Sequence, residues 1–367
     1  MINLVSLLAL CLLIVGYFPV TLAGSMSGQA GVSSAQSTTR CDSQPVQLKP
    51  KSQMSNYGIL RSDDNGKKWT KVVNDSGAID SIIEDGSGQV MAGTLGALTG
   101  RDLNLGLLKS SDDGTTWIRT ASCPSGAGLT DLHSIAFAPN KTLMAAGGRG
   151  IFRSEDRGRT WTPTKEGLEG GAESNVQSLA VSSQSVFFAA TYDGAIRLSN
   201  DGKWTRIGLN GIPLNTLLAT SKGTLLAGSG GKGIYRSTND GLAWKQILVA
   251  PGRNWVGSIV SDSKGRVYSI IADHGIYRSD DDGITWRKLQ IPGKKPVAYA
   301  LAADSRGEVF AAIGDCCPVQ KVVLFRSADA AATWTNILEV PGGDAAIGAI
   351  AVTRTGSIIV GLTTVGD

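Results

Sequence analysis

Apolar residues occur along the chain in short runs that are separated by polar, glycine-rich turns. The runs LHSIAFAP (132–139) and TLMAAGG (142–148) form one pair, and WVGSIVSD (255–262) and RVYSIIA (266–272) form another. Runs of this length, bounded by Gly, Pro and Asp, are typical of strands rather than helices. The pattern therefore predicts pairs of antiparallel strands joined by tight turns.

Such pairs are followed by a third run that ends in a recurring pattern closed by tryptophan. The copies are GILRSDDNGKKW (58–69), GLLKSSDDGTTW (106–117), GIFRSEDRGRTW (150–161), GAIRLSNDGKW (194–204), GIYRSTNDGLAW (233–244), GIYRSDDDGITW (275–286) and VLFRSADAAATW (323–334). Seven of the eight tryptophans close one of these copies. If a fourth strand begins near the tryptophan, each unit of about 44 residues makes one four-stranded propeller blade.

The pattern Ser-x-Asp-x-Gly-x-Thr-Trp resembles the Asp-box, or BNR repeat, of sialidase-like β-propellers. The resemblance covers residues 58–367, and it is specific for the fold but weak for function. It implies that each copy is a hairpin turn at the outer rim of a blade, in which Ser and Asp accept hydrogen bonds from backbone N–H groups and Gly supplies a positive φ. Four copies contribute the structural positions Ser62, Asp64, Gly66, Trp69, Ser110, Asp112, Gly114, Trp117, Ser154, Asp156, Gly158, Trp161, Ser279, Asp281, Gly283 and Trp286.

Two copies depart from this pattern. The fourth is shortened between Asp201 and Trp204, and the seventh has Ala331 where Gly is expected. We therefore predict that both turns are looser than the others or differently shaped.

Three consecutive carboxylates, Asp280, Asp281 and Asp282, raise the alternative of a calcium site. An EF-hand loop would require a bidentate Glu six residues after Gly283, and none stands there. The copy SADAAATW also carries a single acid. We interpret Asp281 as a turn-former and its two neighbours as solvated charges at the rim, and we expect no metal site.

The first copy, at Ser62, has no preceding strand pair, whereas the end of the chain has a pair without a copy. The segment IGAIAVTRTGSIIVGLTTVGD (347–367) supplies two runs and then stops. We predict that it pairs with the strand beginning at Gly58, which would close the ring without an open edge. The expected fold is all-β: a seven-bladed β-propeller of four-stranded antiparallel blades, with one blade split between the N- and C-termini.

The chain is expected to have three parts. Residues 1–23 are almost wholly apolar and end in Thr-Leu-Ala before Gly24, as a signal peptide would, although the run could also remain as a membrane anchor. Residues 24–57 are rich in Ser, Gly, Gln and Thr and read as a polar flexible tail. The propeller follows at 58–367, so we expect a secreted, periplasmic or cell-envelope protein that meets the membrane only through an uncleaved N-terminal segment.

Composition and charge narrow the range of partners. The net charge is +4, and no block of five or more Lys or Arg occurs, so nucleic acid is not an expected partner. The 47 glycines and the low charged fraction of 18% fit many short strands joined by tight turns. We expect a monomer that needs no cofactor.

Four cysteines remain after the predicted leader: Cys41, Cys123, Cys316 and Cys317. An even number in an exported chain favours two disulfides, and four cysteines allow three pairings. A bond between the neighbours Cys316 and Cys317 would be strained, so pairing with Cys41 and Cys123 is favoured. Metal binding is disfavoured because the vicinal pair has no CxxC partner.

Residues that break the repeat are the candidates for ligand binding. The first inward position of each innermost strand is held in turn by Asp80, His133, Gln177, Asn215, Gly257, Tyr299 and Gly348. These residues could simply line a water-filled channel, or they could form a pocket at its mouth. Trp255, the tryptophan outside the copies, supports a pocket because its ring and that of Tyr299 could stack on a sugar, with Arg253 and Asn254 beside them. Alternatively, Trp255 fills the space left by Gly257.

The family resemblance admits two functions. Sialidases use an arginine cluster, a Tyr/Glu pair and an acid/base Asp, but their Phe/Tyr-Arg-Ile-Pro segment is absent here. The arginines before the copy serines (Arg61, Arg153, Arg197, Arg236, Arg278 and Arg326) recur with the repeat and read as scaffold. Photosystem II assembly factors and sortilin-type receptors hold protein partners without catalysis. We therefore expect a non-catalytic scaffold that binds a protein or glycan on its loop face, with a glycoside hydrolase at the channel mouth as the alternative.

Overall fold

The computed structural model describes residues 46–47, 57–74, 76–95, 106–120, 132–148, 150–164, 166–168, 176–249, 255–293, 296–315, 321–341 and 345–363. The predicted leader, the four cysteines discussed above, Arg253 and Asn254 lie outside these residues. Within them the regular structure consists of strands, and no helix is long and apolar enough to cross a membrane.

The strands form seven sheets, which we number as blades in chain order. Blade 1 contains β4 (Ala78–Glu84), β5 (Val90–Leu95), β6 (Leu107–Ser110) and β7 (Ile118–Arg119). Blade 2 contains β8 (Leu132–Phe137), β9 (Leu143–Gly147), β10 (Gly150–Ser154) and β11 (Thr162–Pro163). Blade 3 contains β12 (Val176–Val181), β13 (Phe187–Thr191), β14 (Gly194–Leu198) and β15 (Trp204–Arg206).

The remaining blades repeat this order. Blade 4 contains β16 (Leu214–Ala219), β17 (Leu225–Ser229), β18 (Gly233–Ser237) and β19 (Lys245–Leu248). Blade 5 contains β20 (Val256–Ser261), β21 (Val267–Ile271), β22 (Gly275–Ser279) and β23 (Arg287–Lys288). Blade 6 contains β24 (Pro296–Ala303), β25 (Val309–Asp315), β26 (Lys321–Ser327) and β27 (Thr335–Pro341). Blade 7 contains β28 (Ala346–Val352), β29 (Ile358–Thr363), β2 (Gly58–Ser62) and β3 (Thr70–Asn74).

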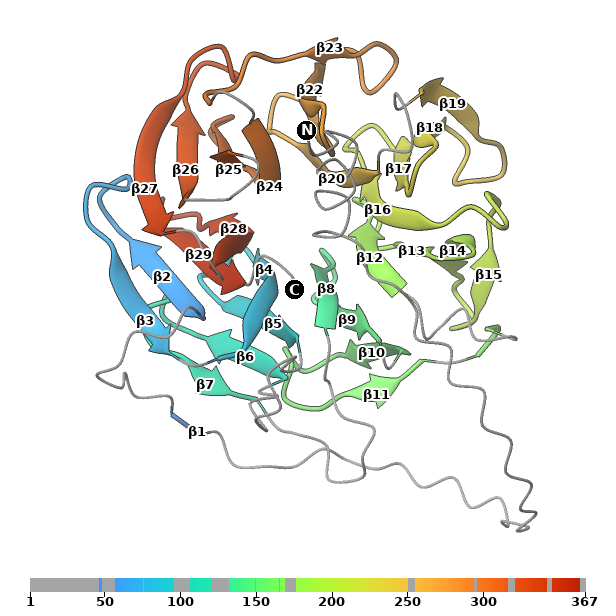
Figure 1. Ribbon diagram of the computed structural model, residues 1–367. Coiled ribbons are helices and arrows are strands. Elements are labelled where there is room, and N and C mark those ends of the chain that lie inside the picture. Colours follow the sequence, from blue (N-terminus) through green and yellow to red (C-terminus); the bar gives the residue numbers. More distant parts are fainter. Residues whose placement is uncertain are drawn as a thin grey trace, which may run out of the picture.

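The seven blades stand around a common axis, with the first strand of each blade innermost (Figure 1). Neighbouring innermost strands contact one another around the whole circle, including β28 against β4, where the circle closes. The predicted all-β class and the seven-bladed propeller are therefore confirmed.

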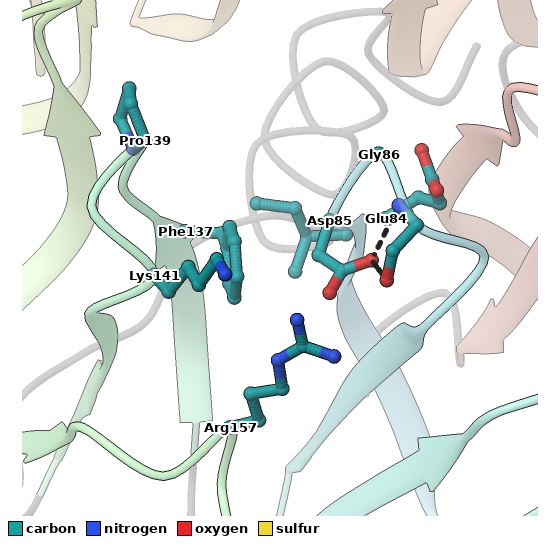
Figure 2. Close-up of a pocket in the computed structure, with 9 residues that line it drawn as sticks. Glu84, Asp85, Gly86, Phe137, Pro139, Lys141 and Arg157 are labelled. Atoms are coloured by element: carbon teal, nitrogen blue, oxygen red, sulfur yellow. Dashed lines mark hydrogen bonds between the residues drawn. The ribbon is translucent and has the colours of Figure 1, made fainter.

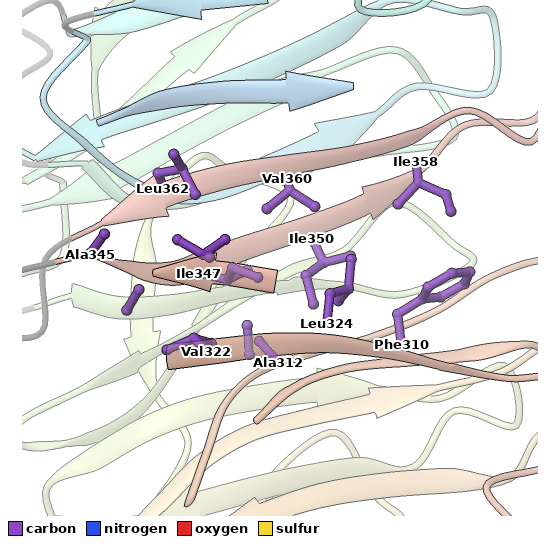
Figure 3. Close-up of a cluster of buried hydrophobic side chains, with 13 residues drawn as sticks. Phe310, Ala312, Val322, Leu324, Ala345, Ile347, Ile350, Ile358, Val360 and Leu362 are labelled. Carbon is purple, nitrogen blue, oxygen red and sulfur yellow. The ribbon is translucent and has the colours of Figure 1, made fainter. Parts of the chain in front are cut away.

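Blade 7 combines strands from both ends of the described chain. Antiparallel pairing joins β29 to β2, with Ser62 opposite Ile358 and Gly58 opposite Leu362. The side chains of β28 and β29 that face blade 6 pack against it in one buried cluster, which includes Ile347, Val360 and Phe310 (Figure 3). The apolar runs near the end of the chain thus contribute both strand pairing and core to this blade.

One short strand lies within the segment that we predicted as a polar flexible tail. Val46–Gln47, labelled β1, pairs antiparallel with β7 and adds a fifth strand to blade 1. A two-residue strand is possible here because the outer edge of a blade presents unpaired backbone groups. The tail prediction therefore does not hold at these two residues.

The turn at 279–286 shows how the repeated pattern is held. Ser279 Oγ accepts a hydrogen bond from Gly283 N (2.8 Å) and donates one to Asp281 Oδ1 (2.7 Å). Asp281 Oδ1 also accepts from Thr285 N (2.8 Å), and Trp286 Nε1 donates to the Gly283 carbonyl (3.1 Å). The hydrogen bonds that Ser Oγ and Asp Oδ1 accept from backbone N–H groups recur in the turns of blades 7, 1 and 2. The polar backbone groups of each turn are therefore bonded within the turn itself.

The two divergent copies differ from one another. In the fourth, Ser199 Oγ donates to the Lys203 carbonyl (2.7 Å), so the shortened turn is differently shaped, as predicted. In the seventh, Ser327 Oγ still accepts from Ala331 N (2.8 Å), and Ala331 takes a φ of 65°. The prediction of a looser seventh turn is therefore wrong, because alanine adopts the left-handed conformation that glycine adopts elsewhere.

Arginines that precede the turn serines join neighbouring blades. In three of these arginines the guanidinium donates to the carbonyl of the residue just before the glycine position in the next blade's turn. The pairs are Arg61–Asp113 (2.8 Å), Arg236–Asp282 (3.0 Å) and Arg278–Ala330 (2.9 Å). These three arginines are therefore part of the scaffold.

The same joints correct our interpretation of Asp282. We expected a solvated rim charge, but its side chain is buried, and Asp282 Oδ2 lies 3.0 Å from Arg236 NH2. Thr224 Oγ1 donates to the same oxygen (2.5 Å). Asp280, by contrast, is exposed and pairs with Arg278.

Candidate functional site

The seven variable positions predicted to face the axis share one backbone feature. In every blade, the pairing of the innermost strand with its neighbour shifts register at that residue, which is the mark of a β-bulge. The seven bulge residues are Asp80, His133, Gln177, Asn215, Gly257, Tyr299 and Gly348. All seven are partly exposed, although they lie on the innermost strands.

A bulge explains why these positions vary while the turns do not. The extra residue opposes no partner on the neighbouring strand, so its side chain is released from the alternation that buries its neighbours. Because each innermost strand starts near the loops that connect successive blades, the bulges lie toward that side of the ring. We call this side the loop face, and the side with the repeated turns the box face.

Two bulge residues from adjacent blades lie close together. His133 Nδ1 of β8 is 3.9 Å from Asp80 Oδ2 of β4. Their side chains are 20% and 33% exposed, respectively, so solvent or a ligand can reach both. This separation exceeds a hydrogen bond, and the pair therefore retains donor and acceptor capacity toward a third molecule.

Two other bulge positions are used by the scaffold. Asn215 Nδ2 donates to the Val256 carbonyl of the next blade (3.3 Å). At Gly348, an added Cβ would lie 2.6 Å from the Ile79 carbonyl oxygen, so a side chain cannot be placed there. The predicted ring of ligand contacts is therefore interrupted at Gly348, and Asn215 already has one partner.

Trp255 is held at the edge of this ring by its backbone. It bridges to Gly230 in the loop of blade 4, and its carbonyl accepts from Ala272 N (3.0 Å). A Cβ added to Gly257 would lie 3.3 Å from Trp255 Cζ3, so the indole covers the space that this glycine leaves. Trp255 as a whole is nevertheless 37% exposed.

Tyr299 and Gln177 complete the described candidates. Burial raises the pKa of Tyr299, so its phenol stays protonated and can donate a hydrogen bond. Gln177 forms no side-chain hydrogen bond to the described residues and is half-buried. Both side chains can therefore offer neutral hydrogen-bonding groups at the axis.

Sequence reasoning missed hydroxyls that follow the bulges and tie the innermost strands together. Each accepts a backbone N–H from the next blade: Ser81 from Ile135 (3.2 Å), Ser134 from Leu179 (3.0 Å) and Ser178 from Leu217 (3.3 Å). The available signal was the serine that directly follows the variable position in these three blades. These bonds position the bulges without belonging to a site.

A second missed residue is Tyr192, in the short loop between β13 and β14. Its side chain is 43% exposed on the loop face. The next residue, Asp193, forms an ion pair with Arg206 and accepts from Gly211 N (2.9 Å), which fixes this loop. An aromatic residue in a tight polar loop was a signal that the sequence analysis did not use.

Neither a metal-binding group nor either of the two cavities described below lies at the bulges in the described part of the chain. No group of three or more His, Cys, Asp or Glu side chains is arranged to hold a metal there or elsewhere among the described residues. Two surface cavities of about 390 and 410 Å³ lie away from the bulges, at the turns of blades 1 and 2 and at the rim between blades 6 and 7.

Comparisons with known proteins support the fold. The family described as the DUF6242 beta propeller domain matches residues 112–253. No curated protein matches the chain.

Solved structures with the same fold include binding proteins and enzymes. YCF48 bound to D1 peptide is 18% identical, with a TM-score of 0.58 over 78% of this chain and 94% of that one. The GH74 enzyme of Niastella koreensis is 21% identical, with a TM-score of 0.56 over 71% of this chain and 45% of that one. The extracellular domain of the B. thetaiotaomicron protein BT4673 is 14% identical, with a TM-score of 0.60 over 79% and 37%. The chain thus spans less than half of the Niastella koreensis enzyme and of BT4673. At these sequence identities the similarity shows the fold alone.

Proposed function

We propose that this protein is a non-catalytic propeller that binds a protein partner on its loop face, at or outside the cell envelope. The observation that carries the proposal is the ring of half-exposed bulge residues beside two exposed aromatic side chains, Trp255 and Tyr192. The repeated turns on the box face are occupied by their own hydrogen bonds. On the loop face, by contrast, side chains such as His133 and Gln177 remain available.

The chemistry of this surface suits a polypeptide. Trp and Tyr are the residues that most often anchor protein interfaces, because a rigid ring buries a large area at a small entropic cost. Gln177 and Tyr299 can bond the peptide groups of a partner without the desolvation cost of a full charge, and the ring nitrogens of His133 add further hydrogen-bonding groups. Asp80 adds one carboxylate that could receive a Lys or Arg side chain.

The seven bulge residues do not include the pair of groups that glycoside hydrolysis requires. Hydrolases of this type use two carboxyl groups that flank the scissile bond. Asp80 is the one carboxylate among the seven bulge residues, and Asp193, in the loop between β13 and β14 of blade 3, is already paired with Arg206. Tyr299 has a raised pKa, which is the wrong direction for a nucleophilic phenolate.

Two comparisons support this proposal without deciding it. The peptide-bound YCF48 structure shows that a propeller of this type can hold a polypeptide, and the match covers nearly all of that chain. The extracellular domain of BT4673 and the apolar first 23 residues of this chain favour a location at or beyond the envelope.

Selection of peptides tests the proposal directly. A phage-displayed peptide library is panned on the purified protein, and the selected peptides are titrated by fluorescence polarisation. We expect Trp255→Ala and His133→Ala each to weaken binding by about tenfold or more. Leu242→Ser serves as a matched control, because Leu242 is an apolar side chain, 83% exposed, on the box face.

Two results would overturn the proposal. In the first, no peptide binds saturably, or the selected peptides bind the Trp255→Ala and His133→Ala variants as well as the parent. In the second, the protein hydrolyses chromogenic glycosides and loses this activity in Asp80→Asn, which would favour the hydrolase instead.

A further inference from the structure

The joint between blades 1 and 2 reverses the charge pattern of two other joints, those that lead into blades 1 and 5. In blades 1 and 5 the residue before the turn glycine is an aspartate, Asp113 or Asp282, which pairs with an arginine of the preceding blade. In blade 2 this position is Arg157, with a φ of 58°. Arginine gains nothing from this left-handed conformation, which favours Gly, Asn and Asp, so the fold does not account for its presence.

In the preceding blade, the residue beside Arg157 is a lysine. Lys109 Nζ donates to the Arg157 carbonyl (3.0 Å), in place of the arginine–aspartate pair. Burial, together with the positive charges of Arg159 and Arg157, lowers the pKa of Lys109. Three cations thus gather at one joint, with Asp85 and Asp156 also near Lys109, and Arg157 and Arg159 are exposed.

A cavity of about 390 Å³ opens beside this joint on the box face. Arg157 and Lys141 line it together with Phe137, while Glu84 and Asp85 form the facing wall (Figure 2). Arg157 and Lys141 form no ion pair within 4 Å with the described residues. Their charges are therefore available to a ligand.

The two carboxylates are fixed by their own turn. Glu84 Oε1 accepts from Gly88 N (2.9 Å), and Asp85 Oδ1 accepts from Ser87 N (2.8 Å). Each carboxylate keeps a second oxygen that can accept a hydrogen bond from a ligand hydroxyl. The cavity thus combines cations on one side, fixed acceptors on the other, and an aromatic side chain.

We propose that this cavity binds an acidic sugar, a single uronic acid unit. Its carboxylate lies against the Arg157 guanidinium and the Lys141 ammonium, since arginine binds planar carboxylates through two hydrogen bonds. Its hydroxyls donate to Glu84 and Asp85. The apolar face of the sugar ring packs on Phe137. A volume of this size fits the lower end of ligand pockets.

The pattern of groups distinguishes this ligand from a simple anion. Sulfate or phosphate would engage the cations, but it would bring charge toward Glu84 and Asp85 without hydroxyl donors. A neutral sugar could engage these carboxylates and Phe137 but would leave the cations without a partner. The site is on the box face, so it is independent of the protein-binding surface proposed above.

Titration calorimetry with D-galacturonate and D-glucuronate tests the proposal on the purified protein. We expect saturable binding of at least one uronate, and weaker binding of D-galactose and of sulfate at equal ionic strength. Arg157→Asn should weaken uronate binding by about tenfold or more. This variant should fold, because Asn65 takes the same turn position in blade 7 with a φ of 61°.

Two further variants test whether a loss of uronate binding comes from the site itself or from a change in the fold. Phe137→Leu keeps an apolar wall but removes the ring, and it should weaken uronate binding while leaving the melting temperature near that of the parent. Lys222→Asn removes an exposed cation from the same face, far along the ring in blade 4, and should leave binding unchanged. The proposal is overturned if neither uronate binds saturably, if sulfate binds as tightly, or if Arg157→Asn binds as the parent does.

Discussion

The outer turns and the inner bulges each occur at seven equivalent places in this propeller, but their side chains differ in how far they are used to hold the structure. An outer turn reverses the chain with few residues, and its serine and aspartate side chains accept hydrogen bonds from backbone N–H groups of the same turn. An inner bulge adds one residue to a paired strand and releases its side chain from the strand's alternation, although Asn215 bonds to the next blade and Gly348 leaves no room for a side chain. The turns therefore repeat in sequence, whereas the bulges range from glycine to tyrosine.

This difference separates the parts of the molecule that hold the ring from those that can acquire a function. A residue such as Ser279 is buried and is bonded on both sides. A residue such as Gln177 could be exchanged without leaving a buried group unpaired. The predictions below test this division, beginning with the most severe change.

Removal of residues 347–367 should prevent folding. The deletion takes away nearly all of β28 and all of β29, so that β2 loses its partner strand and blade 6 loses the cluster around Ile347 and Val360. An open ring with an unpaired edge and exposed apolar side chains should aggregate. Size-exclusion chromatography and a thermal melt provide the measurement, and a soluble protein that melts cooperatively would contradict the closure.

Gly283→Ala should cost about 2–3 kcal/mol of unfolding free energy. Gly283 has a φ of 84°, and an added Cβ would lie 2.7 Å from Cδ2 of the buried Leu226. Blade 6 carries alanine at the equivalent place, Ala331, so the substitution tests whether that tolerance belongs to its surroundings. Urea unfolding measures the change, and a loss below about 0.5 kcal/mol would show that any turn accepts alanine.

Ser279→Ala should cost about 1.5 kcal/mol, because the buried Gly283 N–H loses its acceptor. The same urea titration measures it, with the exposed Ser263→Ala as the control. A neutral result would mean that the repeated hydroxyls do not hold the turns.

Acid should weaken the turns through their aspartates. Burial acts to raise the pKa of Asp281, but hydrogen bonds from Thr285 and Ser279 outweigh it and lower the pKa from the ordinary 3.8 to about 2. The unfolded chain then binds the proton more readily, so this contribution to stability is complete above about pH 4 and is lost as the pH falls toward 2. Unfolding free energy should fall less steeply over this window in Asp281→Asn than in the parent; equal slopes would contradict the assignment.

Gln177→Ala should have the smallest effect, within about 0.5 kcal/mol of the parent. This bulge side chain is half-buried and forms no hydrogen bond to the described residues. Thermal melting of this variant beside Ser279→Ala gives the comparison directly. A loss as large as that of Ser279→Ala would mean that the inner bulges are structural too.

Much of the fold and part of the candidate site could be predicted from the sequence. The copies that end in Trp69 to Trp334 gave the blade count, because each turn is held by residues within one short segment. The bulge positions could be located because they vary within a regular repeat. Tyr192 stands out in the sequence as an aromatic residue in a polar loop, but its exposure could not be predicted. The pairing of Asp282 could not be predicted either, because contacts between blades do not follow from a local sequence pattern.

The sequence by itself determined seven antiparallel blades and the chemistry of their turns, because those interactions close within a few residues and recur at each copy. Only the tertiary structure decided which charges are paired and which remain open. Asp282 is neutralised by an arginine 46 residues away, whereas the equivalent Arg157 meets a lysine 48 residues away and faces a cavity. Blades fix their turns locally, but the partners of a turn's side chains come from the next blade, and only the packed ring brings them together.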